Sequence, residues 1–535
     1  MASDILTGVN VRVQPRSGFD KSRKNILTAK VGTITPILHD LIIPNTDVSV
    51  KMAISAALPP LASETFMRAS LKVEAFFVPL RLLYGGFESW LTGYEMYSTN
   101  GTSFRAQLPR VKIESSNSSY FAPGSLLDYL GVQLTSDTFS SASAQNQQVL
   151  VNIFPLLAYH RIYDDWFRNT KIQKPIFTPP GETTLASGSS TANTKLRCMP
   201  FSAYQTIQDI PINSTFFDSV ALGSLRQRNY GSDYFTIATP SPQLGSPMTV
   251  STNSSGQFSI AALRSANSIQ QWEELQNLTG TRIQDFNKAN YGASLSSGIA
   301  QRSVYLGSAE YPVYSKGVYA NQGVTATNNP FTSVGARYGS AYASGTDFVV
   351  KGHFDEQGIF MILATLVPEA NYTNRCTALM RKFIALGSQV DIPNPMLQNI
   401  GNEEIMQTEL DVALDFADSS LIFGYVPRYT WHKTATNEVH GLLIQGNSLA
   451  SFVSQRAFNT ASPTISSNFL QIRTSDLNNV TAVSNQLSLY GCWIDSYIQY
   501  FCSMPLAKYA LPSLQNPAYE HGVSVHLNNN GSKID

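Results

Sequence analysis

The residue patterns of common catalytic sites are missing from this chain. It contains no Gly-x-Ser-x-Gly nucleophile elbow, no Gly-Lys-Ser/Thr phosphate loop, no Gly-x-Gly-x-x-Gly turn and no His-Glu-x-x-His zinc motif. Three acidic doublets occur, at Asp164-Asp165, Glu273-Glu274 and Glu403-Glu404. A glycosidase needs two carboxylates facing each other across a cleft, whereas adjacent residues point in different directions. We interpret the doublets as solvated faces and predict that the protein is not an enzyme.

The histidines and cysteines do not form a recognisable metal site. In His353-Phe354-Asp355-Glu356, a strand would place His353 and Asp355 on one face, and two ligands do not close a site. His160 lies among apolar residues and is predicted to be a hydrogen-bonded core histidine. The roles of His432 and His440, which flank an expected turn, stay open. The cysteines are expected to be buried thiols in a reducing compartment, because they form no Cys-x-x-Cys pair: Cys198, Cys376, Cys492 and Cys502. We therefore predict no cofactor and no metal.

The first 30 residues are a basic arm in a chain whose formal net charge is zero. The arm is expected to be extended, and only Asp4 and Asp20 oppose its six cations, which are Arg12, Arg16, Lys21, Arg23, Lys24 and Lys30. If all six met single-stranded phosphates, the logarithm of affinity would fall with the logarithm of salt with a slope of about 4. Pairing with acidic groups of neighbouring subunits explains the arm equally well. These six cations are the candidate nucleic-acid-binding residues.

The composition limits the class of protein. Charged residues are 14% of the 535 residues, against about 25% in an ordinary soluble protein, and aromatic residues are 11%. Such a bias is typical of surfaces hidden against other subunits and also of secreted β-rich domains. The longest apolar run, residues 358–367, is half of what a membrane span needs, so no membrane insertion is predicted. The first 20 residues lack the features of a signal peptide.

Alternating and helical patterns predict a mainly β protein with large loop and helix insertions. Period-2 alternation and flanking turn residues predict strands at 48–54, 67–75, 233–239, 347–354, 357–367, 410–416, 440–445 and 493–504. Helical spacing predicts helices at 155–169 and 260–278, the second ending at Gly280. Polar stretches predict loops at 135–148, 178–194, 241–257 and 315–345. Strands spread over the whole length favour one β-sandwich or barrel domain, residues 1–535.

Several ordered segments resemble the major capsid protein of Microviridae, in its gokushovirus-like branch of small icosahedral single-stranded DNA bacteriophages. The matching blocks are 15–22, 32–36, 44–47, 76–81, 158–169, 233–243, 423–429 and 504–514. The first contains Arg16-Ser17-Gly18-Phe19-Asp20-Lys21-Ser22, and the family's usual next His is Arg23 here. The last lacks the Arg and the Gly of the family's ending.

The resemblance implies an eight-stranded antiparallel jelly roll of the viral capsid type. It implies that the chain self-assembles into a sixty-copy T=1 shell around circular single-stranded DNA, in the bacterial host cytoplasm, and resides in the virion. The partners would be scaffolding, pilot and small basic DNA-packing proteins, and a host cell-surface receptor. Residues 178–345 would be the main insertion, with a surface protrusion at 315–345 used in host attachment.

A second hypothesis is a β-sandwich protein that binds or cleaves glycans. Its support is the aromatic, Ser/Thr/Asn-rich composition. The missing signal peptide and the missing carboxylate pair argue against it. The two hypotheses combine if the insertion tips of a shell bind host glycans.

Overall fold

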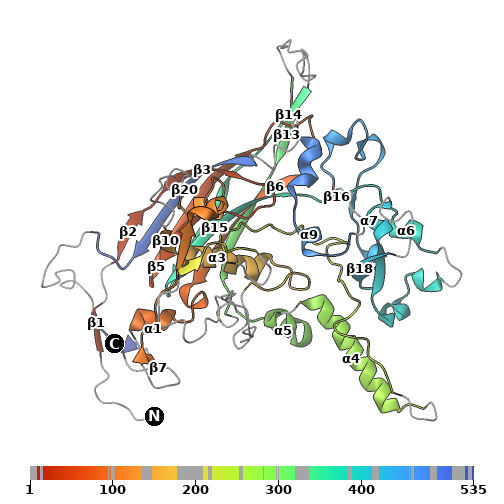
Figure 1. Cartoon of the computed structure of the whole chain (residues 1–535), viewed down its shortest axis with the longest axis horizontal. Coiled ribbons are helices and arrows are strands. Elements are labelled where there is room, and N and C mark those ends of the chain that lie inside the picture. The colour runs from red at the N-terminus through yellow and green to blue at the C-terminus, as the bar shows by residue number, and fades with distance from the viewer. Residues whose placement is uncertain are drawn as a thin grey trace.

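The computed structural model describes residues 9–12, 16–93, 95–97, 103–133, 148–176, 209–214, 220–251, 257–280, 282–296, 298, 301–319, 337–383, 388–412, 421–456, 458, 463–481, 491–508, 524–527 and 533–534. Two antiparallel sheets form its centre (Figure 1). The six-stranded sheet runs in the order β13 (Tyr314–Tyr319), β14 (Arg337–Phe354), β5 (Thr46–Ala57) and β20 (Cys492–Met504), with β2 (Ser17–Asp20) and β3 (Arg23–Ala29) both pairing with β20. The four-stranded sheet runs in the order β12 (Val304–Pro312), β6 (Ala69–Pro79), β15 (Gly358–Pro368) and β4 (Thr35–Ile42).

Alternating side chains create the core between the two sheets. In β5 every second residue, including Val48, Val50 and Met52, is buried. These side chains join Leu71 of β6 and Phe360 of β15 in one apolar cluster. Burying a side chain of this size stabilises the fold by about 1.5–3 kcal/mol. The buried side chains of β5 therefore form one side of the apolar core that keeps the two sheets packed face to face.

The four-stranded sheet is covered on both faces. Phe360 and Ile362 of β15 face the core between the sheets, whereas Ile359 and Met361 join a second cluster on the opposite face. A strand buried on both sides reads as a continuous apolar run rather than an alternating one. This is why the longest apolar stretch of the sequence is a central strand.

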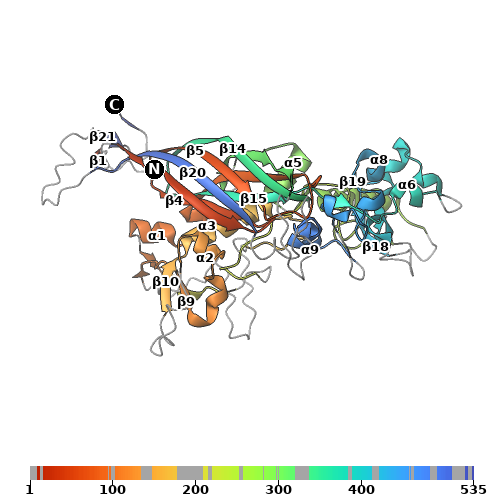
Figure 2. The same cartoon turned by 90° about the horizontal axis from the view of Figure 1, so that it is seen from above.

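The long connection between β6 and β12 supplies the layer that covers this sheet. In Figure 2, α1, α2, β9 and β10 lie together on one side of the sheets. The connection contains α1 (Phe87–Thr92), β7 (Met96–Tyr97), β8 (Ser103–Phe104), β9 (Arg110–Glu114), α2 (Leu126–Tyr129), β10 (Gln148–Asn152), α3 (Phe154–Ile162), a π-helical turn (Tyr163–Phe167), β11 (Asp209–Pro211), α4 (Ile260–Thr279) and α5 (Ile283–Tyr291).

A third apolar cluster lies beside one end of the sheets (Figure 1). It includes Phe235, Tyr372 and Phe423, and most of it comes from the connection between β15 and β20. That connection contains β16 (Asn371–Tyr372), α6 (Ala378–Arg381), β17 (Glu403–Met406), α7 (Gln407–Leu410), β18 (Ile422–Val426), α8 (Thr430–Lys433), β19 (Asn437–Glu438) and α9 (Ser467–Leu470). Near the ends of the chain, β1 (Val9–Arg12), β21 (Ser524–Leu527) and β22 (Lys533–Ile534) form a small sheet.

The central strand predictions are confirmed, and the mainly antiparallel β character with them. The expected strands at 48–54, 67–75, 347–354, 357–367 and 493–504 correspond to β5, β6, β14, β15 and β20. The expected helices at 155–169 and 260–278 are α3 with its π-helical turn, and α4, which has Gly280 as C-cap.

Two strand predictions are wrong, and a third, 410–416, is wrong in the part that the structure describes. Residues 233–239 form turns, because the Asp233 carboxylate accepts hydrogen bonds from the N–H groups of Phe235 and Thr236. Residues 441–443 form a 3₁₀ turn, and Leu410 ends α7. Residues 413–416, the rest of that third strand, lie outside the described residues.

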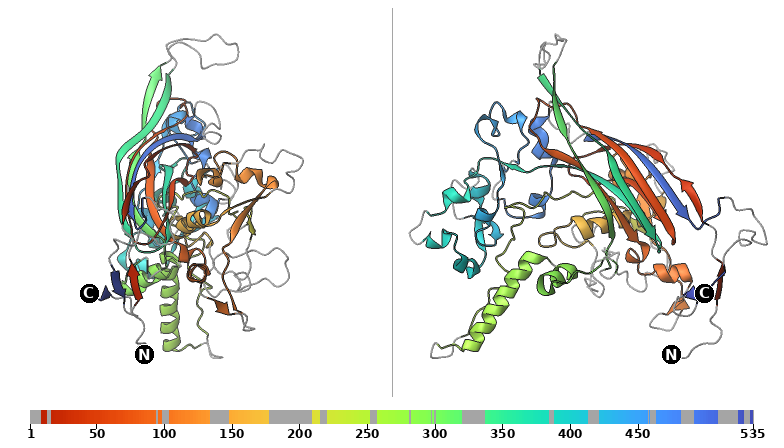
Figure 3. Two further views of the ribbon diagram at one scale, coloured as in Figure 1. Left: turned by 90° about the vertical axis from the view of Figure 1, so that its left-hand side faces the viewer. Right: turned by 180° about the vertical axis from the view of Figure 1, so that it is seen from behind.

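The loop predictions have mixed outcomes. Residues 315–319 and 337–345 are strands of the β13–β14 hairpin rather than loop, and this hairpin extends beyond the other strands of its sheet (Figure 3). Residues 241–251 have no regular structure, as expected. The expected loops at 135–147 and 178–194 lie outside the described residues.

Candidate nucleic-acid and assembly surfaces

Five of the six predicted cations of the N-terminal arm lie along the edge of the six-stranded sheet, and three of these five pair with carboxylates. Arg16 forms an ion pair with Asp47 and donates to the Ser503 carbonyl at 3.1 Å. Lys21 Nζ lies 2.7 Å from Asp40 Oδ2, and Lys24 Nζ lies 3.1 Å from Asp495 Oδ2. These pairs neutralise part of the positive charge that the sequence assigns to the arm.

The other three predicted cations differ in position. Arg23 and Lys30 are exposed. Arg23 is near His39, whose pKa is lowered first by burial and then by this guanidinium. Arg12 lies in β1, where it pairs with Ser524 of β21. The structure thus brings Arg16, Lys21, Arg23, Lys24 and Lys30 to one sheet edge and places Arg12 in the small terminal sheet.

The outward face of the six-stranded sheet carries aromatic residues that the sequence analysis did not single out. Along β20, Trp493, Tyr497 and Phe501 alternate with buried residues and are about half exposed, at 49%, 49% and 53%. Lys51 of β5 and Lys351 of β14 are exposed in the same sheet. We call these five residues, together with Lys24, the outer sheet face. The sequence did contain a signal for these residues. In the strand predicted at 493–504, aromatic residues occur in both alternating sets of side chains, so one set has to face away from the core.

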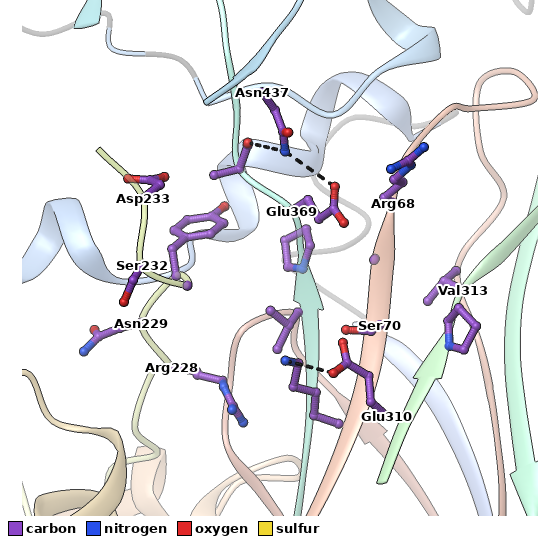
Figure 4. A pocket seen from close by; sticks show the side chains of 18 of the residues that line it. Arg68, Ser70, Arg228, Asn229, Ser232, Asp233, Glu310, Val313, Glu369 and Asn437 are labelled. Atoms are coloured by element: carbon purple, nitrogen blue, oxygen red, sulfur yellow. Dashed lines mark hydrogen bonds and ion pairs between the residues drawn. The ribbon is translucent and has the colours of Figure 1, made fainter. Parts of the chain in front are cut away.

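A polar cavity of about 880 Å³ opens between β6, β12 and the segment 228–233 (Figure 4). Two of the cations that line it are paired: Lys72 with Glu310 at 3.1 Å, and Arg228 in a two-point ion pair with Glu74. Asn437 Nδ2 lies 3.5 Å from Glu369 and 3.2 Å from the Ala370 carbonyl. Each of these carboxylates accepts a hydrogen bond from a neighbouring side chain. The polar contacts in this cavity therefore join neighbouring elements of the fold.

The prediction that Asp164 and Asp165 form a solvated face is wrong. Both side chains are buried, and each pairs with an arginine one helical turn away: Asp164 with Arg168 at 2.6 Å and Asp165 with Arg161 at 2.9 Å. Asp165 also accepts from the N–H and the hydroxyl of Ser303, both at 2.9 Å. The Asp165 carboxylate therefore joins the α3 region to the segment that leads into β12, whereas the Asp164 carboxylate also accepts from the N–H of Ile176 at 3.3 Å.

The other acidic doublets differ from one another. Glu403 is buried and pairs with Lys382, so its part of the prediction is also wrong. Burial raises the pKa of Glu403, and the Lys382 ammonium acts in the opposite direction. Glu273 and Glu274 lie on α4 with intermediate exposure.

The structure also shows the positions of the histidines singled out in the sequence and of three of the four cysteines. His160 is fully buried and hydrogen-bonded, as predicted. His353 contacts Asp47 at 2.6 Å and Asp355 at 3.0 Å, whereas Glu356 pairs with Arg81. His432 and His440 are exposed, and His440 lies 3.3 Å from Glu438. Cys492 and Cys502 are buried, Cys376 is partly exposed, and Cys198 lies outside the described residues.

Helix α4 exposes a row of apolar side chains that winds around the helix, because its members are spaced by three or six residues. We call this row the α4 stripe. None of its 20 residues is buried, and its Ile260, Leu263, Ile269, Trp272 and Leu275 are 38–67% exposed. The Ser259 hydroxyl caps its start, and near its end Asn277 donates to the Ser241 carbonyl at 2.7 Å. Figure 1 shows the helix projecting away from the sheets. A surface helix normally buries such a stripe, so α4 has the character of a subunit contact.

The two facing sheets, the neutral charge and the exposed apolar elements are the features of a subunit that packs against copies of itself. Residues 8–514 match the family described as capsid protein (F protein), and the chain belongs to this family. It is therefore a phage structural protein of the virion, and the resemblance to the gokushovirus-like Microviridae capsid protein that the sequence predicted is confirmed.

Two relatives show how far the similarity extends. The chain is 23% identical to capsid protein VP1 of Chlamydia phage 1 in an alignment of 600 positions, which covers 94% of this chain and 96% of the relative. It is 21% identical to capsid protein VP1 of Bdellovibrio phage phiMH2K over 533 positions, covering 93% and 95%. Within the described residues, the structure contains no helix of the length and apolarity that a membrane span requires.

Proposed function

We propose that this chain is the major capsid protein that forms a sixty-copy T=1 icosahedral shell around circular single-stranded DNA. The observation that carries the proposal is the family membership over residues 8–514 together with the exposed apolar stripe of α4. A low charge content favours packing against copies, and zero net charge limits repulsion between them.

The proposed subunit core is an eight-stranded jelly roll. Two strand orders support it: β3-β20-β5-β14 in one sheet and β4-β15-β6-β12 in the other. In a jelly roll, two such four-stranded sheets face each other and the connections between them carry the variable loops. The main insertion predicted from the sequence, residues 178–345, includes the later part of the connection between β6 and β12 and also β12, β13 and the start of β14. The β13–β14 hairpin within 315–345 is the proposed protrusion for attachment to a host receptor.

The proposed partners are scaffolding, pilot and small basic DNA-packing proteins, and the proposed place of assembly is the bacterial host cytoplasm. Sedimentation and cryo-electron microscopy of the full-length chain, expressed with the scaffolding protein of its phage, test the shell. Uniform particles of sixty copies that protect circular single-stranded DNA from nuclease are expected. A chain that stays monomeric at every concentration, with or without the scaffold, contradicts the proposal.

A glycan array on the assembled particle tests receptor binding. Deletion of residues 320–336, between the two strands of the hairpin, is expected to abolish attachment to host cells while particles still form. Attachment that survives this deletion would assign the receptor contact to another insertion.

A further inference from the structure

The outer sheet face has a regular row of aromatic rings. Trp493, Tyr497 and Phe501 are four residues apart on one strand, so their side chains share a face and lie about 13 Å from one another. This is about four times the rise between stacked bases in a duplex. Each ring therefore offers a separate stacking surface to an extended strand rather than a platform for a compact helix.

Amines stand beside the rings. The strand register places Lys24 directly opposite Tyr497, and Lys51 opposite Gln499, diagonal to both Tyr497 and Phe501. Lys351 of β14 pairs with Ser49 of β5, and Ser49 pairs with Phe501 of β20, so Lys351 lies two strands away from Phe501 on the same face. Three carboxylates share the face: Asp495 pairs with Lys24 at 3.1 Å, Asp47 pairs with Arg16, and Asp20 lies opposite Phe501. With Arg16 included, the four cations outnumber these carboxylates by one, so the face favours an anion only moderately.

A cavity adjoins the last ring. Its volume is about 810 Å³, and Lys351, His353 and Phe501 are among the residues that line it, together with the carboxylates Asp20 and Asp47. Asp47 is already paired with Arg16 and His353. Phe501 forms an apolar wall, and Lys351 supplies a cation at the same place. An aromatic wall beside an amine is the combination that holds an unpaired base and its phosphate.

The position of the face in the fold leaves it available. The four-stranded sheet is covered on both sides by apolar clusters, whereas the six-stranded sheet is covered by the core only on its inner side. On β20 the half-exposed rings are separated by Asp495 and Gln499, and the amines that flank them come from neighbouring strands. Ile26 and Val349 are also exposed on this face. In α4, by contrast, the exposed row is mostly Ile and Leu with no flanking row of amines within the helix. Rings flanked by amines are the arrangement that binds single-stranded nucleic acid, and we take this as the occupant rather than a second copy of the chain.

We propose that the outer sheet face is a binding platform for single-stranded DNA, in which Trp493, Tyr497 and Phe501 each stack on one unpaired base and Lys24, Lys51 and Lys351 contact the backbone. The inference rests on the proposed function, because it identifies where the shell meets its genome. Binding at one subunit is weak and independent of sequence, and repetition around the shell makes it strong. Three phosphate contacts predict a salt slope of about 2.

The test measures binding of a 20-nucleotide oligo-dT to the full-length chain by quenching of tryptophan fluorescence and by ultraviolet crosslinking. Alanine at any one of the three rings is expected to weaken binding about tenfold, since stacking on one base is worth roughly 1–3 kcal/mol. Trp493→Phe is expected to bind nearly as well as the wild type but to lose most of the quenching. Crosslinked peptides should contain residues 493–501.

Matched controls separate this inference from general damage. Tyr291→Ala removes an aromatic ring that is 75% exposed on α5 and should leave binding unchanged. Equal oligo-dT affinity for the wild type and the Trp493→Ala/Tyr497→Ala/Phe501→Ala variant would overturn the inference, as would loss of particle assembly with unchanged affinity, which would mark the face as a contact between copies.

A particle assay distinguishes this failure from failure of the proposed function. If the triple variant forms particles with a normal DNA content, the outer sheet face is not the DNA-binding platform, whereas the proposed function as a DNA-enclosing shell is retained. If wild-type particles contain no DNA although the chain binds oligo-dT through the three rings, the proposed function fails and the platform stands.

Discussion

Arg226 donates a hydrogen bond of 3.0 Å from Nε to Nδ1 of His160, in the layer that covers the four-stranded sheet. The other ring nitrogen of His160, Nε2, donates to the Leu222 carbonyl at 2.7 Å. Both contacts require the neutral imidazole, because Nδ1 must accept. Burial, and secondly the positive charge of Arg226, hold the pKa of His160 well below its ordinary value of 6.5.

This arrangement predicts sensitivity to acid. The folded-state pKa is depressed, so below about pH 6.5 the unfolded chain binds a proton that the folded chain does not. The free energy of unfolding should then fall by roughly 1 kcal/mol per pH unit until the folded-state pKa is reached. The measurement is the urea midpoint between pH 7.5 and pH 5.5 for the wild type and for His160→Gln, which keeps a donor and an acceptor. A His160→Gln variant whose midpoint falls as steeply as that of the wild type would assign the effect to other groups.

The buried pairs of the π-helical turn predict a large difference between two kinds of ion pair. Asp165→Leu leaves Arg161 without its buried carboxylate and should cost about 3–5 kcal/mol of stability. Asp209→Asn breaks the exposed pair with Arg110, 2.7 Å long, and should cost less than about 1 kcal/mol. Denaturant unfolding of the two variants gives the comparison. Similar losses for both would show that burial does not govern these pairs.

The exposed stripe of α4 predicts an assembly defect without a folding defect. Trp272→Lys should leave the stability of the single chain within about 0.5 kcal/mol, since no residue of this helix is buried. It should sharply reduce the yield of particles, because a charge replaces an apolar contact between subunits. Gln271→Lys, which adds the same charge one residue away, is the control. Particle yield by sedimentation checks both, and normal assembly of Trp272→Lys would remove α4 from the proposed contacts.

The thiols predict a graded reactivity. Burial raises the pKa of the Cys492 thiol to about 12, so almost no thiolate forms at pH 8. Of the three cysteines that the structure describes, Cys376 is partly exposed and should react first. Iodoacetamide labelling of the native chain, followed by peptide mass spectrometry, should modify Cys376 and spare Cys492 until denaturant is added. Early modification of Cys492 would show that β20 opens locally in solution.

Strand patterns predicted the sheets well, because alternation is a local consequence of facing one core. Val48–Ile54 and Trp493–Met504 are examples in which composition and period agree. Asp233–Thr239 was predicted to be a strand from its flanking turn residues, whereas the carboxylate of Asp233 stabilises a turn within it. Alternation does not reveal which strands are neighbours, so the pairing of β20 with both β5 and β3 was not predictable from period alone.

The candidate site was harder to predict than the fold. Counting charges identified a basic arm, but the partners of Arg16, Lys21 and Lys24 come from distant positions: Asp47, Asp40 and Asp495. The burial of Asp165 likewise involves Ser303, which is 138 residues away in the chain. Neutralisation of a charge is a property of the folded chain, and a residue count does not contain it.

The place of β20 in the middle of its sheet constrains how the molecule is made. Ser17 pairs with Met504 across almost the entire length of the polypeptide, and β20 separates β5 from β2 and β3. The first strands to leave the ribosome therefore wait, unmatched, for nearly the last one, because contacts so distant in sequence form late. A chain that stops before residue 492 lacks β20, so β5 has no partner on that side and β2 and β3 have no strand to pair with. The six-stranded sheet can therefore be completed only after nearly the whole chain has been synthesised.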